Sequence, residues 1–357
     1  MVNINYLSVF KAAVFLSFPS ALISHYLMAI ILWYKSLDLL IAAPSLSAYF
    51  LGFLIGVVYV QRSPSSLSRL AGIFLSSHVI TTIALAGFGY GYLTIFITGL
   101  VGITSGGLLS LPLSKLLSTS RALLLSAFPL IGAFLLVNLG TDSPLVASAL
   151  ISFIGAVLVF ASLKIMVPKP VLLAKASLRL PKEFGALALV TSIGCSLGTL
   201  LTPIVALVEY SIDPLWIGAL IAASLLLTNL LGRALASQKS LQRSMVATIG
   251  FSLLLVFIVL GISPSRYFFM VLWLVALIDV SAYNTFVVAA VNTIKKCEAQ
   301  SFNLFSSAVT PLGSLLGMLI WAVGSYQSMF FLAALFILIS VLILRLLLKG
   351  EQTNAGP

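Results

Sequence analysis

The chain has 357 residues, of which 61% are hydrophobic and only 8% are charged, and its net charge is +11. A soluble domain carries roughly a quarter charged residues, so this composition excludes a soluble fold and makes lipid the solvent. Lys and Arg collect in the cytoplasmic loops of membrane proteins, so the positive charge predicts a membrane topology rather than a nucleic-acid partner.

Long apolar segments follow one another along the chain, separated by charges, Pro/Gly clusters and Ser-rich turns. A helix needs about 20 mostly apolar residues to cross the hydrocarbon core. The sequence therefore predicts an all-α, polytopic membrane protein of about twelve transmembrane helices. The predicted spans are residues 8–33, 39–60, 68–88, 91–113, 121–140, 143–166, 185–209, 214–236, 244–262, 267–293, 300–322 and 326–348.

The loops between these spans alternate in charge. With the N-terminus inside, all of the 19 Lys and Arg residues except Lys35 and Arg266 fall on the cytoplasmic side. The outer loops instead carry acidic residues, namely Asp38, Asp142, Glu209 and Asp213. This bias predicts a multi-pass protein of the cell (plasma) membrane with both termini in the cytoplasm.

The chain divides into two similar halves. We expect an N-terminal six-helix bundle over 1–166, a basic cytoplasmic linker over 167–184, a C-terminal six-helix bundle over 185–349 and a short tail over 350–357. Gly56 and Gly232 close the second span of each half, and Pro129 and Pro311 interrupt the fifth. Two six-span repeats in parallel orientation are a transporter arrangement.

This layout resembles the major facilitator superfamily over nearly the whole chain. The resemblance implies two six-helix bundles and, after the second and eighth spans, basic loops that take part in gating. Candidates for these loops are Gly56, Arg62, Arg69, Gly232, Arg233 and Lys239. Val60 and Ala236 stand where the family motif has aspartate, and Thr98 stands where proton-coupled members carry an arginine before Gly102.

Small residues recur four apart in two spans, as Gly52 and Gly56 in the second and as Gly313 and Gly317 in the eleventh. Such a face lets helix backbones approach closely. In the resembled fold these two spans meet across the halves, so the glycines are candidates for a sliding surface. Ordinary static helix packing is the alternative.

Asp279 is the clearest chemical candidate, because an ionisable group inside hydrocarbon is costly unless it is paired or hydrated. It lies near the middle of the tenth span, with Tyr283 one turn further on and Asn284 beside it. In the resembled fold the first, fourth, seventh and tenth spans line the central cavity, which places Asp279 on the substrate path. It would bind a proton or a cationic substrate; a structural carboxyl bonded to a neighbouring helix is the alternative.

Two further candidate groups lie on the other cavity-lining spans. An imidazole ordinarily titrates near neutral pH, so His25 in the first span could share a proton with a carboxylate, or it could be a packing residue. Ser192, Ser196 and Thr199 in the seventh span could offer hydroxyls to a ligand, or bond to the carbonyls of their own helix. His78 in the third span is interpreted as structural, because that span is peripheral in the resembled fold.

The function that these features favour is secondary active transport of a small molecule, as proton-coupled efflux of hydrophobic or cationic compounds. An uptake permease for a neutral solute such as a sugar, or a non-transporting sensor on the same fold, are the alternatives. We expect no enzyme activity, because the eight acids are scattered singly, and no cofactor, metal or nucleic acid. The expected partners are the small-molecule substrate, the lipid bilayer and a coupling ion such as H⁺, and we expect a monomer.

Overall fold

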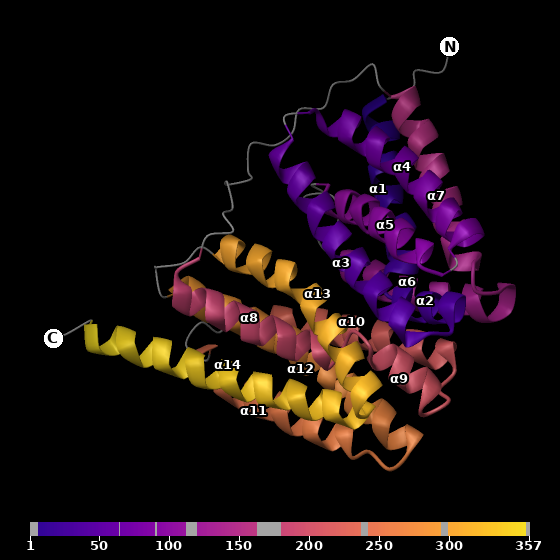
Figure 1. Ribbon diagram of the computed structural model, residues 1–357. Coiled ribbons are helices and arrows are strands. Elements are labelled where there is room, and N and C mark those ends of the chain that lie inside the picture. The colour runs from indigo at the N-terminus through magenta and orange to yellow at the C-terminus, as the bar shows by residue number, and fades with distance from the viewer. Residues whose placement is uncertain are drawn as a thin grey trace. The chain divides into compact units, whose positions relative to one another are not determined.

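The computed structural model describes residues 6–63, 65–89, 91–111, 120–162, 180–236, 242–293 and 299–354. Every regular element within these ranges is an α-helix (Figure 1). The all-α class predicted from the continuous apolar segments is therefore confirmed. The residues of the predicted linker before Leu180 lie outside the described ranges, and α14 continues into the predicted tail as far as Asn354.

The helices belong to two compact units. Unit 1 comprises residues 1–175 with 214–222, and unit 2 comprises 176–213 with 223–357, so the first turns of α10 pack with unit 1. The helices before the division are α1 (Tyr6–His25), α2 (Met28–Ser36), α3 (Leu39–Arg62), α4 (Leu67–Phe88), α5 (Leu93–Ser110), α6 (Ser120–Leu139) and α7 (Ser143–Ala161). Those after it are α8 (Lys182–Leu197), α9 (Thr202–Val208), α10 (Pro214–Ala236), α11 (Gln242–Gly261), α12 (Arg266–Thr293), α13 (Ala299–Val323) and α14 (Tyr326–Asn354).

Most of these helices are long and apolar enough to cross a membrane. Within the described residues eight stretches pass this test, and a ninth is formed by α1 and α2 together. Shorter apolar stretches at Ser126–Leu139, Pro214–Leu230 and Met245–Gly261 occupy the remaining predicted spans. The polytopic membrane architecture of about twelve helices is confirmed, since a helix satisfies its own backbone hydrogen bonds inside lipid.

The same helix pairs recur inside each unit. In unit 1, α7 packs against α1 and α4, and α4 packs against α5. In unit 2, α14 packs against α8 and α11, and α11 packs against α12, and Figure 1 shows α11 and α14 running side by side. In each half the sixth span packs against the first and third spans, and the third span packs against the fourth. The two units therefore repeat one arrangement of spans. The recurrence agrees with a fold class of two related bundles, while the bounds expected for the two bundles remain a prediction.

Charged side chains lie at the helix ends of unit 1. Asp38 caps α3, where its carboxylate accepts a hydrogen bond from the Leu40 N–H at 2.8 Å. Lys35, just before it, forms an ion pair with Asp142 at 2.7 Å and also donates to the Ala86 carbonyl at 2.9 Å. These contacts join the ends of α2, α4 and α7, where the Lys35 side chain is buried and the Asp142 carboxylate is partly exposed to solvent.

Candidate functional site

The first span is broken in its last third. α1 ends at His25 and α2 begins at Met28, and the two helices meet at an angle of 49°. Between them the Leu27 N–H donates to the Ser24 carbonyl at 3.2 Å, in place of a regular helical bond. Non-helical backbone at membrane depth is tolerated where it is buried in protein or lines a water-filled cavity. The break is therefore a candidate ligand position.

His25 is fixed at this break by aromatic neighbours. Its Nδ1 lies 2.8 Å from the Tyr49 hydroxyl of α3. The rings of Tyr26, Phe50 and Phe53 lie 5.0, 6.2 and 5.3 Å from the imidazole, centroid to centroid. His25 is only partly buried, and within the described residues its Nε2 has no hydrogen-bond partner. The structure thus leaves one ring nitrogen available for a ligand.

The seventh span is interrupted as well. α8 ends at Leu197, a turn begins at Gly198, and α9 begins at Thr202 with Pro203 in its first turn. Proline has no N–H to donate to the preceding turn, so the helical ladder is broken here. Both pieces still form one apolar stretch, Lys182–Val208. The seventh span occupies the same place in its half as the first, so each half begins with an interrupted span.

The predicted hydroxyls of the seventh span bond within their own helix. Ser196 Oγ donates to the Ser192 carbonyl at 2.5 Å, and Thr199 Oγ1 donates to the Cys195 carbonyl at 2.7 Å. Ser192 and Ser196 are buried, whereas Thr199, which lies in the interruption itself, is partly exposed. Back-bonding, one of the two alternatives raised by the sequence, thus describes Ser196 and Thr199, and Thr199 is the more accessible of the three hydroxyls.

Asn284 of α12 lies close to this interruption. Its Oδ1 is 3.8 Å from the Cys195 sulfur of α8. The Cys195 carbonyl also accepts the hydrogen bond from Thr199. The Asn284 side chain is exposed, and within the described residues its amide Nδ2 has no partner. Two accessible polar groups of unit 2, Thr199 and Asn284, are therefore held near each other by Cys195.

Asp279 lies midway along α12 and is partly buried. Its Oδ2 accepts a hydrogen bond from Ser252 Oγ of α11 at 2.7 Å. An ionised carboxylate offers about four acceptor positions, so this bond leaves the group with further capacity. A bond to a neighbouring helix is also what a purely structural carboxyl would make, and the role of Asp279 in proton or substrate binding remains a prediction.

Tyr283 is directed into the core of unit 2. Its side chain is fully buried, and its hydroxyl lies 2.8 Å from Ser340 Oγ of α14. Ser340 Oγ in turn lies 2.5 Å from Thr191 Oγ1 of α8. Three hydroxyls thus tie α8, α12 and α14 together. This position favours a structural role for Tyr283, although it shares a helix with Asp279 and Asn284.

The glycines singled out in the second span pack against α5, a helix of the same unit. A Cβ atom added to Gly52 or Gly56 would lie closer than 3.0 Å to the carbonyl oxygens of Gly99 and Ile103 respectively. The contact between α3 and α5 is the most extensive between any two helices of the described chain. These glycines therefore permit backbone-to-backbone packing inside unit 1.

In unit 2 the glycines of α13 face the seventh span. A Cβ on Gly313 would overlap the side chain of Ser196, and one on Gly317 would come within 3.0 Å of Leu201 Cδ1. The two glycines thus line the contact of α13 with the interrupted span. The sliding surface between the halves that the resemblance implied remains a prediction.

The described loop candidates lie at or near helix ends. Arg62 is the last residue of α3, and Arg69 lies in the first turn of α4; both side chains are exposed. Gly232 and Arg233 lie in the last turns of α10, and Lys239 lies outside the described residues. The gating role of this group remains a prediction.

A buried polar network surrounds His78 of α4. Its Nδ1 lies 2.8 Å from Thr104 Oγ1 of α5, and its Nε2 lies 2.9 Å from Ser148 Oγ of α7. Ser148 donates in turn to the Ser20 carbonyl of α1. Four helices of unit 1 are therefore joined through one histidine with both ring nitrogens satisfied, which describes a structural residue. Within the described residues no three metal-ligating side chains come together, at His78 or elsewhere.

Sequence reasoning did not identify Tyr49, Ser252 or Ser340 as partners of the candidates. A tyrosine or serine in a membrane helix is common, and the sequence carried no signal of which helix each would face. The interruption of the seventh span had a signal, because Gly198 and Pro203 lie close together in an apolar run. The break after His25 had only Pro19, one and a half turns before it.

The comparisons with known proteins come from structure alone, because no protein-family model and no curated protein matches the sequence. An auto-inhibited POT family peptide transporter superposes with a TM-score of 0.71 at 13% identity, covering 96% of this chain and 97% of that one. A POT family transporter in complex with a thioalcohol-conjugated peptide gives 0.70 at 14% identity, covering 94% and 95%.

The nucleoside transporter NupG gives a TM-score of 0.68 at 14% identity, covering 97% of this chain and 100% of that one. Each likeness extends over both units and over nearly the whole of the other protein. At such low identity a likeness describes the fold. The chain therefore has the fold of these transporters, which agrees with the all-α membrane fold class that the sequence predicted.

Proposed function

We propose that the chain is a secondary transporter that moves a small molecule across a membrane by alternating access. The observation that carries this proposal is the whole-length fold similarity to proteins described as peptide and nucleoside transporters. The interrupted first and seventh spans add to it. Discontinuous helices in corresponding positions of the two halves are the best pointer to a transporter binding site.

The substrate contacts that we propose are the accessible polar groups at the two interruptions. These are His25 in unit 1, and Thr199 with Asn284 in unit 2. Aromatic rings surround His25, and these rings would pack against an apolar part of the substrate. Within each unit these groups suit a hydrophobic or weakly cationic compound better than a dianion, which would need arginine or lysine partners.

Asp279 is the proposed coupling residue. A carboxylate in hydrocarbon is costly when ionised, so proton binding and release at this position changes the energy of the surrounding helices. Ser252 can donate to the ionised carboxylate, as it does here at 2.7 Å, or accept from the protonated acid. The group can therefore exchange a proton while keeping one hydrogen bond, which is what proton-coupled efflux requires.

We also propose the plasma membrane as the location, with both termini in the cytoplasm. Unit 1 supports this orientation by its helix ends. Arg62 ends α3 and Arg69 lies in the first turn of α4, whereas Asp38 precedes α3 at its other end. Asp142 precedes α7 and is paired with Lys35, which also contacts the Ala86 carbonyl near the last turn of α4. Basic ends face the cytoplasm in most membrane proteins.

The test is transport in liposomes that contain the purified protein. With an imposed pH gradient, we expect wild type to move lipophilic cations against their concentration gradient. In Asp279→Asn the cations should merely equilibrate across the membrane. Glu209→Gln is the matched control, because Glu209 is an exposed carboxylate outside the spans. His25→Ala and Asn284→Ala should raise the substrate KM. Gradient-driven transport that survives in Asp279→Asn would remove the coupling role, and binding without flux would instead indicate a sensor.

Uptake of a neutral polar solute is the second candidate. It is favoured by the neutral groups at the interruptions, namely the Tyr49–His25 pair, Thr199 and Asn284. In that case sugars or nucleosides should compete for transport where lipophilic cations do not. Downhill flux of the solute should then be unchanged in Asp279→Asn.

A further inference from the structure

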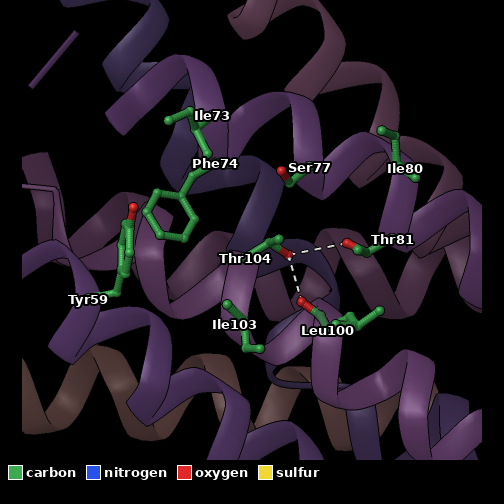
Figure 2. Close-up of a pocket in the computed structure, with 9 residues that line it drawn as sticks. All are labelled: Tyr59, Ile73, Phe74, Ser77, Ile80, Thr81, Leu100, Ile103 and Thr104. Carbon is green, nitrogen blue, oxygen red and sulfur yellow. Dashed lines mark hydrogen bonds between the residues drawn. The ribbon is translucent and has the colours of Figure 1, made fainter. Parts of the chain in front are cut away.

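Unit 1 has a groove on its side, formed by residues of α3, α4 and α5. We refer to it as the α3–α5 groove, and its lining residues are those labelled in Figure 2. Its volume is 420 Å³, within the range of about 300–1,000 Å³ typical of small-molecule sites. The rings of Tyr59 and Phe74 meet edge to face at one end, with centroids 5.9 Å apart, and Thr81 and Leu100 lie at the other (Figure 2).

The walls of the groove are apolar side chains exposed on the surface of unit 1. Ile80 is 69% exposed, Tyr59 is 51% exposed and Ile73 is 46% exposed, whereas Phe74 at the floor is buried. The helices that carry them are all long and apolar enough to span a membrane. Surface of this kind on a membrane span faces hydrocarbon, so the natural occupant of the groove is an acyl chain.

Two arginines lie just beyond the Tyr59 end. Arg62 follows Tyr59 by three positions on α3, and Arg69 precedes Ile73 by four on α4, so each shares a helix face with a lining residue. Both guanidinium groups are exposed, and within the described residues neither forms an ion pair. The arginines therefore stand one helical turn from the mouth of the groove.

No internal carboxylate is available to these arginines in their part of the chain. Before Glu183 the sequence contains only two acids, Asp38 and Asp142. Asp38 caps the opposite end of α3, about 36 Å away along a helix of 24 residues. Asp142 is paired with Lys35, which lies at the end of α2 and is therefore separated from Arg62 by the length of α3. The exposed Arg62 and Arg69 are therefore open to an anion from outside this part of the chain.

We propose that the α3–α5 groove binds one acyl chain of an anionic phospholipid whose phosphate lies against Arg62 and Arg69. The dimensions agree with a lipid of one leaflet. From Arg69 to Thr81 α4 rises about 18 Å, and one leaflet contributes about 15 Å of hydrocarbon. Charge selects the headgroup, and the apolar walls hold the chain.

The experiment counts lipids bound to the full-length protein by native mass spectrometry. It compares phosphatidylglycerol with phosphatidylcholine of identical acyl chains, titrated into detergent-solubilised protein. We expect one tight phosphatidylglycerol molecule on wild type and much weaker phosphatidylcholine binding. A basic residue at an anionic surface is worth about a five-fold change in affinity. The double variant Arg62→Gln/Arg69→Gln should therefore lose roughly thirty-fold for phosphatidylglycerol, and Arg266→Gln, an exposed arginine on α12, should lose nothing.

A further variant tests whether the acyl chain lies in the α3–α5 groove. Leu100→Trp adds bulk inside the groove and should weaken both lipids, while Leu150→Trp adds the same bulk to an exposed position of α7 outside the groove lining. Equal binding of the two lipids to wild type, or an unchanged preference in the arginine double variant, would overturn the headgroup assignment. Undiminished binding in Leu100→Trp would overturn the groove as the site.

Discussion

The contact between α3 and α5 depends on glycine from both sides, and a single methyl group should disrupt it. A Cβ on Gly56 would overlap the Ile103 carbonyl oxygen of α5 and would lie only 2.7 Å from the Gly107 nitrogen. A Cβ on Gly106 would overlap the Phe53 carbonyl oxygen of α3 in the same way. Since these are backbone atoms, no rotamer change can relieve the clash, and the two helices must move apart.

The expected cost follows from these distances. Ordinary van der Waals contact of a Cβ begins at 3.4 Å, and the Ile103 oxygen lies 2.0 Å from the added Cβ. The two atoms must therefore separate by about 1.4 Å, and overpacking of this kind costs roughly 1–3 kcal/mol. Replacing a helical glycine by alanine also gains up to about 1 kcal/mol of helix propensity. Gly56→Ala should therefore lower the free energy of unfolding by about 2 kcal/mol relative to an alanine placed where there is space.

Gly87→Ala is that reference, because nothing lies within 4 Å of a Cβ at this exposed position of α4. The measurement is SDS-induced unfolding in mixed micelles, followed by circular dichroism. The double variant Gly56→Ala/Gly106→Ala should cost less than the sum of the two single variants, since one separation of the helices relieves both clashes. Equal stability of Gly56→Ala and Gly87→Ala, or strict additivity in the double variant, would refute the backbone contact.

Two further perturbations test unit 1 with the same unfolding assay. His78→Leu should lower the free energy of unfolding by about 2 kcal/mol, because it removes two buried hydrogen bonds that join three helices; an unchanged midpoint would contradict the network. Asp142→Asn should cost about 2 kcal/mol more than Lys35→Gln, because the Lys35 side chain is 3% exposed and that of Asp142 is 42% exposed. Removing the acid leaves a buried cation without its countercharge, although Lys35 still donates to the Ala86 carbonyl. Removing the lysine leaves a carboxylate that water reaches, so the opposite order would contradict this reasoning.

The spans were predictable because hydropathy is a local property of the chain. Each apolar run had to form a helix in lipid, and the charges at Lys35, Asp38 and Asp142 had to stay near water at the helix ends. The repeat was predictable for a related reason, since glycines and prolines recur at matching places of the two halves. None of these inferences required knowledge of which helices touch.

The partners of the candidate residues could not be predicted in this way. The direction in which Asp279 or Tyr283 points depends on the rotation of α12 within its bundle, which packing against α11 and α14 decides. The spacing of Gly52 and Gly56 indicated a close helix approach, and the helix that approaches is α5. α5 has glycines of its own where it contacts the backbone of α3. Small-residue faces predict proximity, and the topology of the bundle selects the partner.

The interruptions of the first and seventh spans are the features that hydropathy conceals. The residues at the breaks are themselves mostly apolar, so an average over a membrane-length window remains high through His25 and through Gly198. The cost of a broken helix lies in backbone groups that lose their partners, and lipid cannot supply replacements. The turns at both breaks keep hydrogen bonds of their own, such as Leu27 N–H to Ser24 and Thr199 N–H to Ser196. A break that recurs in both halves beside an accessible polar side chain is the physical reason for proposing substrate contacts at His25 in unit 1 and at Thr199 in unit 2.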